Sequence, residues 1–238
     1  MKNMIKEFGQ FFKFIVNPFL VINPAGKISI VRCLYFAALG IGAGVLLALV
    51  GSMPVIVKYF CYKDNTLIDR MLTHGILYAL FVGGVIAPIM EELIGRYYLN
   101  SVWGNIIYLF INLLIIGQVL YGFELLQIIV YVLLLIVSLF LIGILYEHNI
   151  LFKKKISFLV TKYFPAFFYV SVLTFALVHV SNFDICHQHS VFVIFLVLPQ
   201  FFAGLVLSYL RLKWGLKTGI LVHSLNNLVA ITLGYLFR

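Results

Sequence analysis

The sequence predicts an all-α protein, a polytopic transmembrane bundle of about seven helices (six to eight) with its N-terminus on the inner side. Of the 238 residues, 63% are hydrophobic and 11% are charged, whereas soluble domains are about 45–50% apolar and about 25% charged. The apolar residues run in stretches long enough for spanning helices, which need ~20 residues each. The alternation typical of a membrane β-barrel does not occur. These observations exclude a water-soluble enzyme.

Residues 1–30 are predicted to form an interfacial segment ahead of a single transmembrane domain, residues 31–238. Apolar residues recur every three or four positions between lysines in this segment: Ile5, Phe8, Phe11, Phe12 and Ile15. This spacing predicts an amphipathic helix lying on the membrane surface. The small-residue cleavage site of a secretory signal is missing.

Apolar runs separated by charged residues predict seven spans, at about 33–57, 71–99, 102–122, 125–146, 165–183, 191–210 and 218–236. With the N-terminus inside, thirteen of the 17 Lys and Arg residues fall in inner segments. This bias favours that orientation. The formal charge of +9 is therefore interpreted as orienting the spans against an anionic membrane surface, and no nucleic-acid partner is expected.

Ionisable residues within the predicted spans are few. Each costs ~2.5 kcal/mol or more in a bilayer, which makes these residues functional candidates. They form three clusters, EExxxR (Glu91, Glu92, Arg96), FxxxH (Phe175, His179) and HxxxN (His223, Asn227).

Helical geometry separates the two carboxylates of the first cluster. At ~100° per residue, Glu92 and Arg96 lie only ~40° apart around the helix axis, whereas Glu91 and Arg96 lie ~140° apart. Glu92 is therefore the expected ion-pair partner of Arg96. Glu91 is left without a local partner, which suits a general acid or base. A purely structural network of all three side chains is the alternative.

The two histidine clusters are stronger functional candidates in combination than either is alone. An isolated histidine in an apolar helix is more often a packed residue than a catalyst. Here two imidazoles, a free carboxylate and an amide come from three different spans, and such groups can activate a water molecule and stabilise an oxyanion. A shared water-filled pocket is therefore predicted.

The three motifs, in this order on separate spans, resemble the CAAX protease and bacteriocin-processing (CPBP) family of intramembrane glutamic proteases, related to the type II CAAX prenyl endopeptidases. The glycine-containing stretch GLKTGILVHSLNN around the last motif strengthens the resemblance, which covers residues 80–230. The chain departs from the family in the long separation of Glu91 from His179, and residues 101–164 are interpreted as two extra spans.

The resemblance implies a role for each motif. Glu91 and His179 would activate the attacking water, and His223 with Asn227 would stabilise the oxyanion. The supporting residues would be the ion pair of Glu92 and Arg96 together with the ring of Phe175.

The expected function is hydrolysis of a peptide bond in a hydrophobic or lipidated peptide or protein, by a multi-pass protein of a bacterial plasma membrane that needs no cofactor. A metalloprotease with Glu91, His179 and His223 as ligands is less favoured, because HExxH is absent from the sequence. A proton-coupled transporter and a non-catalytic immunity or scaffold protein are the alternatives from other classes.

Overall fold

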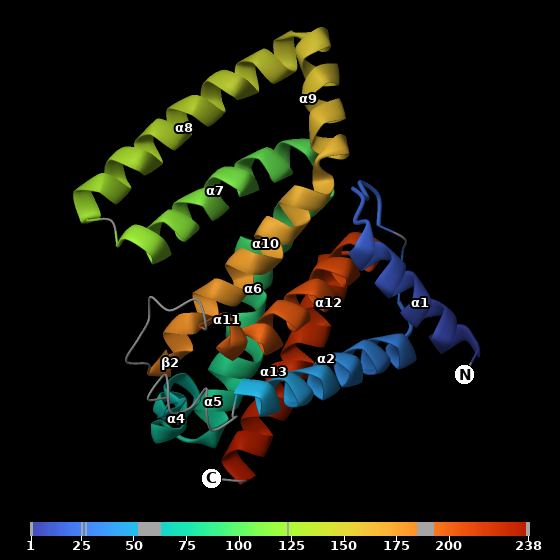
Figure 1. Cartoon of the computed structure of the whole chain (residues 1–238), viewed down its shortest axis with the longest axis vertical. Helices are drawn as coiled ribbons and strands as arrows, with labels where there is room; N and C mark the ends of the chain where they lie inside the picture. Colours follow the sequence, from blue (N-terminus) through green and yellow to red (C-terminus); the bar gives the residue numbers. More distant parts are fainter. Residues whose placement is uncertain are drawn as a thin grey trace.

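The protein is a bundle of helices, as predicted, and helices from distant parts of the chain lie side by side (Figure 1). The computed structural model describes residues 2–24, 26, 28–51, 63–122, 124–184 and 193–236. Five stretches are long and apolar enough to cross a membrane: Ile30–Leu47, Ile76–Asn100, Leu125–His148, Phe164–Asn182 and Leu216–Leu236. They correspond to five of the seven predicted spans.

The helices at the other two predicted spans are not among these five. The apolar part of α7 (Val102–Tyr121) covers Val102–Gln118, and α12 (Leu198–Trp214) carries two cations in its last turn. Residues 52–57 of the first predicted span and 191–192 of the sixth lie outside the described residues.

The N-terminal segment forms the amphipathic helix α1 (Lys2–Val16), followed by α2 (Ile30–Gly51). Phe11 and Phe14 of α1 are buried in the core, where both rings pack on Tyr209 of α12. The apolar side of α1 therefore covers the bundle itself, and its predicted position on the membrane surface stays a prediction.

The helix that carries the two glutamates is irregular. The short helices α4 (Thr66–Thr73) and α5 (Ile76–Phe81) lead into a π-helical turn, η1 (Val82–Ile86). Helix α6 (Ala87–Arg96) follows and ends in a 3-10 turn, η2 (Tyr97–Asn100). Arg211 of α12 donates hydrogen bonds to the carbonyls of Arg96 and Tyr97, which satisfies backbone acceptors left open where α6 ends.

The next helices form an arm that extends away from the bundle (Figure 1). It consists of α7 and α8 (Leu125–His148), and α9 (Ile150–Lys162) leads the chain back toward the bundle. The predicted extra spans of residues 101–164 are thus two long helices and a shorter third one.

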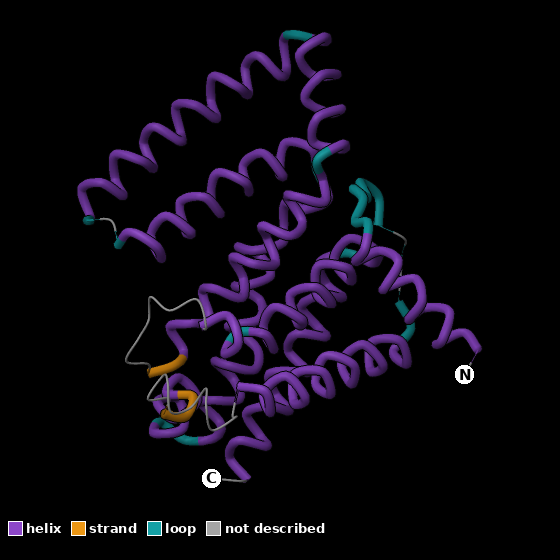
Figure 2. The backbone as a smooth tube through the Cα atoms, in the orientation of Figure 1, coloured by secondary structure: helices purple, strands orange, loops and turns teal. Residues whose placement is uncertain are grey.

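The C-terminal part completes the bundle. Helix α10 (Phe164–Val178) ends in the 3-10 turn η3 (His179–Asn182), and α11 (Val193–Leu196) precedes α12 and α13 (Leu216–Leu236). Two short strands, β1 (Lys63–Asn65) and β2 (Phe183–Asp184), pair antiparallel (orange in Figure 2).

Segments predicted to share a membrane side lie together in the structure. Lys213, near the end of α12, contacts Glu7 of α1 at 2.7 Å, and both belong to predicted inner segments. The paired strands β1 and β2 both come from predicted outer segments. These contacts group the segments as the predicted crossings require, and the inner position of the N-terminus stays a prediction. Three of the cations counted for it, Lys27, Lys58 and Arg238, lie outside the described residues.

Candidate functional site

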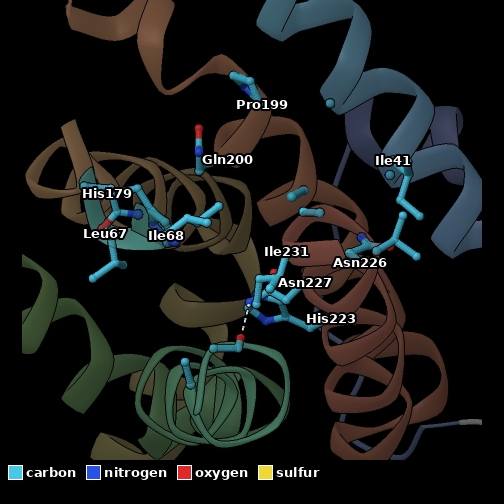
Figure 3. A pocket seen from close by; sticks show the side chains of 18 of the residues that line it. Ile41, Leu67, Ile68, His179, Pro199, Gln200, His223, Asn226, Asn227 and Ile231 are labelled. Carbon is cyan, nitrogen blue, oxygen red and sulfur yellow. Dashed lines mark hydrogen bonds between the residues drawn. The ribbon is translucent and has the colours of Figure 1, made fainter. Parts of the chain in front are cut away.

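A pocket of about 360 Å³ lies between α2, α4, α6, α10, α12 and α13. Its polar lining includes four of the predicted residues: Glu91, His179, His223 and Asn227. Figure 3 shows His223 and Asn227 together at this pocket, with His179 coming from another part of the chain. The structure therefore brings together side chains up to 136 positions apart in the sequence (91 to 227).

Glu91 lies between the two imidazole rings. Its Oε2 atom is 3.7 Å from His179 Nε2 and 3.6 Å from His223 Nε2. Both distances exceed a good hydrogen bond and suit groups that share a water molecule. The Glu91 side chain is 34% exposed and lines the pocket, while its Oε2 atom is buried and has no hydrogen-bond partner among the described residues. Glu91 has the position predicted from helical geometry, turned away from Arg96.

The orientation of His179 is fixed by its own helix. Its Nδ1 lies 2.7 Å from the carbonyl oxygen of Phe175, one turn earlier. Since a carbonyl only accepts, Nδ1 carries the proton and donates it to this bond. In the neutral ring, Nε2 is then an unprotonated acceptor, and it is the atom that points toward Glu91.

His223 is held by the second glutamate. Its Nδ1 lies 3.0 Å from Glu92 Oε1, and the same oxygen accepts a hydrogen bond from the Arg96 guanidinium. Glu92 and Arg96 are 0% and 1% exposed, so the predicted ion pair is present and fully buried. It joins directly to His223, a contact that no spacing in the sequence predicts.

Arg96 has two further contacts that hold it in place. Its Nε donates to Ser208 Oγ of α12 at 3.2 Å, and its guanidinium carbon lies 4.1 Å from the centre of the Phe175 ring. That ring also contacts His179 and His223, with centroid separations of 4.6 and 5.8 Å. Phe175 is thus an apolar platform shared by the arginine and both histidines.

Asn227 is anchored by the π-helical turn before α6. Its Nδ2 donates to the carbonyl of Gly83 at 3.0 Å, the dashed line in Figure 3. The N–H of Ala87 donates to Val82, one residue further back than in an α-helix. The next donor in this register would be Pro88, which has no N–H. The Gly83 carbonyl is therefore open to Asn227, and a π turn placed at a functional site follows a general tendency.

Several residues that shape the site were missed by the sequence analysis. Ser208 is fully buried, but a single serine within an apolar helix gives no sequence signal. Gly219 faces Glu92, because a Cβ there would lie 3.0 Å from Glu92 Oε2. Its position one turn before His223, on the same face of α13, is a signal that could have identified it.

The described residues include no group of three or more His, Cys, Asp or Glu side chains arranged to hold a metal ion. The convergence of Glu91, His179 and His223 is therefore a carboxylate between two imidazoles rather than a recognisable ligand set.

Comparison with known families finds one match. Residues 149–229 match the sequence model of the family described as type II CAAX prenyl endopeptidase, Rce1-like. The match spans about a third of the chain and includes His179, His223 and Asn227, while Glu91 precedes it. No curated protein and no solved structure shows significant similarity to the chain. The family match confirms the resemblance to CAAX-type endopeptidases that the three motifs predicted.

Proposed function

We propose that this integral membrane protein is an intramembrane endopeptidase that uses a glutamate-activated water molecule. The observation that supports the proposal most directly is the position of Glu91 Oε2, 3.7 and 3.6 Å from the Nε2 atoms of His179 and His223 in one pocket. A bacterial plasma membrane stays a prediction from the sequence resemblance.

Water activation falls to Glu91 and His179. Both present acceptor atoms to the same space, so one water can donate a hydrogen bond to each. Glu91 takes the proton as the water oxygen bonds to the scissile carbonyl carbon. The same proton then passes to the nitrogen of the leaving amine as the C–N bond breaks, which leaves Glu91 ionised for the next cycle.

Oxyanion stabilisation falls to His223 and Asn227. Because Glu92 accepts from His223 Nδ1, Nε2 of this ring becomes a donor only when the imidazole is protonated. Glu91, Glu92 and Arg96 together carry one net negative charge, which a protonated His223 neutralises. Asn227 uses one Nδ2 hydrogen for Gly83 and has a second for the oxyanion.

The substrate class follows from the pocket and the family match together. The lining is mostly apolar, and the family name specifies prenylated CAAX substrates. A membrane-associated, lipidated peptide is the proposed substrate.

Replacement of Glu91 by Gln is the decisive experiment. With purified protein in liposomes and an internally quenched, farnesylated CAAX peptide, Glu91→Gln should lower cleavage by about 100-fold or more, because the general base is lost. Glu147→Gln is the matched control, since this carboxylate is 68% exposed at the end of α8. Cleavage that persists in Glu91→Gln rejects the mechanism.

Two further measurements separate the alternatives. Full chelation should leave cleavage unchanged; loss of activity that returns with added zinc would identify a metalloprotease. Proton uptake that depends on Glu91, without cleavage of any peptide, would identify a transporter.

A further inference from the structure

Three side-chain amides line the same pocket and take no part in the proposed chemistry: Asn182, Gln200 and Asn226. Gln200 lies in the first turn of α12, and Asn226 precedes the oxyanion residue Asn227 on α13. Gln200 Oε1 and Asn226 Oδ1 are both buried and have no hydrogen-bond partner among the described residues. A buried acceptor left unmet costs about 1–3 kcal/mol, so a ligand that supplies donors would offset this cost.

Asn226 is held in place by close contact with α2. A Cβ added at Gly40 would lie 2.6 Å from Asn226 Nδ2, so only glycine lets the amide sit there. Figure 3 shows Asn226 on the side of Ile41, while Gln200 lies near Pro199. The two amides therefore reach the pocket from different helices at different points of its wall.

The remaining lining specifies what kind of ligand would fit. Apart from the catalytic groups the pocket is uncharged, and its walls include Ile41 and Val45 of α2 and Leu67 and Met71 of α4. Such a surface favours apolar side chains. A side-chain amide carries one acceptor and two N–H donors, which matches the N–H and C=O of a peptide unit. A prenyl or acyl chain has no donor for either oxygen.

We propose that Gln200 and Asn226 bind the backbone of the peptide substrate, their side-chain oxygens accepting hydrogen bonds from its N–H groups beside the scissile bond. This inference rests on the proposed function and adds the positioning residues that hold the peptide in register. Its structural basis is two buried, unmet acceptors in the pocket that contains Glu91 and both histidines.

The test measures binding rather than cleavage. Glu91→Gln protein in liposomes is titrated with a fluorescent farnesylated CAAX peptide and with analogues that each carry one backbone N-methyl group, which removes a single N–H. Methylation at one or two positions near the scissile bond should weaken binding about 5- to 20-fold, as expected for one lost hydrogen bond. Gln200→Leu and Asn226→Leu, each added to Glu91→Gln, should weaken the parent peptide similarly.

The proposal is tested by the coupling between methylation of the peptide and replacement of the amide side chain. In a double-mutant cycle, the effect of methylation should disappear in the variant that lacks the matching amide. Gln118→Leu on α7, an exposed position outside the pocket, is the matched control and should leave the methylation effect intact. Equal methylation effects in all variants would overturn the proposal.

Gly40→Ala provides a second variant that keeps the amide chemistry. The added methyl group should displace Asn226 and weaken the parent peptide as Asn226→Leu does, and unchanged affinity would contradict the role of Asn226. Because binding is measured without turnover, a protein that cleaves nothing would refute the proposed function while leaving this cycle readable.

Discussion

The helices around the pocket and those of the α7–α8 arm are both apolar, but they differ in how far their side chains are buried. In the bundle, α6 buries a complete ion pair, Glu92 with Arg96, and α12 is buried along a continuous stretch from Gly204 to Leu212. In the arm, α8 has no buried residue. A helix that is apolar on all sides and has no buried residue is suited to a lipid environment. Polar groups are thus confined to the place where several helices meet.

Helix α7 joins the two regions. On one face it carries Asn105, Tyr108 and Asn112, all buried, and the hydroxyl of Tyr108 accepts a hydrogen bond from Ser171 of α10 at 3.0 Å. The family match begins at residue 149, immediately after α8. Glu91 also precedes the matched residues, so the expectation that α8 contributes little to the proposed chemistry rests on its lack of buried residues.

The largest expected effect concerns the buried ion pair. Glu92→Leu leaves the Arg96 charge buried and unpaired, which should lower the free energy of unfolding by about 3–5 kcal/mol. Glu147→Leu in the arm breaks the exposed contact with Lys153 (3.6 Å) and should cost about 0–1 kcal/mol. Thermal unfolding in detergent measures both.

A double variant separates stability from chemistry. Glu92→Leu with Arg96→Met removes both charges and should recover most of the stability, but not the cleavage rate, because His223 Nδ1 has lost its acceptor. Recovery of both stability and cleavage rate would show that the ion pair is only structural. Equal losses of stability in Glu92→Leu and Glu147→Leu would remove the contrast between the two regions.

The second prediction concerns access to the pocket along α2. Gly44 lines the pocket, and a Cβ there would meet no atom within 4 Å. Gly44→Leu should therefore be tolerated by the fold but fill space needed by substrate, lowering kcat/KM at least about tenfold, or ~1.4 kcal/mol. Gly42 also has open space but does not line the pocket, so Gly42→Leu should retain activity. Equal activity in the two variants would show that substrate does not approach α2.

The spans and the ion pair could be predicted from the sequence, whereas the contacts of individual glycines could not. Hydropathy located the spans, because lipid requires continuous apolar helices, and helical spacing paired Glu92 with Arg96. Both depend on residues near each other in the chain. The meeting of Glu91 with His179 and His223 was predicted from the few ionisable residues within the spans, and the resemblance added their roles. The roles of Gly40 and Gly219 depend on contacts between remote helices that no local pattern encodes.

The π turn before α6 gives the third prediction. Pro88→Ala supplies the missing N–H, which in the π register would donate to the Gly83 carbonyl and compete with Asn227 for it. We expect kcat to fall about 3- to 10-fold, which corresponds to a rise in the activation free energy of well below 2 kcal/mol. KM and thermal stability should be maintained. An unchanged kcat would show that Asn227 does not depend on this carbonyl.

The smallest effect is expected from the arm and tests the comparison most directly. Leu133 of α8 is 57% exposed and Leu207 of α12 is 0% exposed, so the same change to alanine samples both regions. Leu207→Ala should cost about 2–5 kcal/mol, because it leaves a cavity in packed surroundings. Leu133→Ala should change stability by less than about 0.5 kcal/mol, because it exchanges one lipid-facing apolar surface for another. Its cleavage rate should stay within about twofold of the unaltered protein, since rate effects follow the same small free-energy change. A larger loss of cleavage in Leu133→Ala, with stability unchanged, would mean that α8 contacts the substrate, and the functional unit would then extend beyond the bundle into the arm.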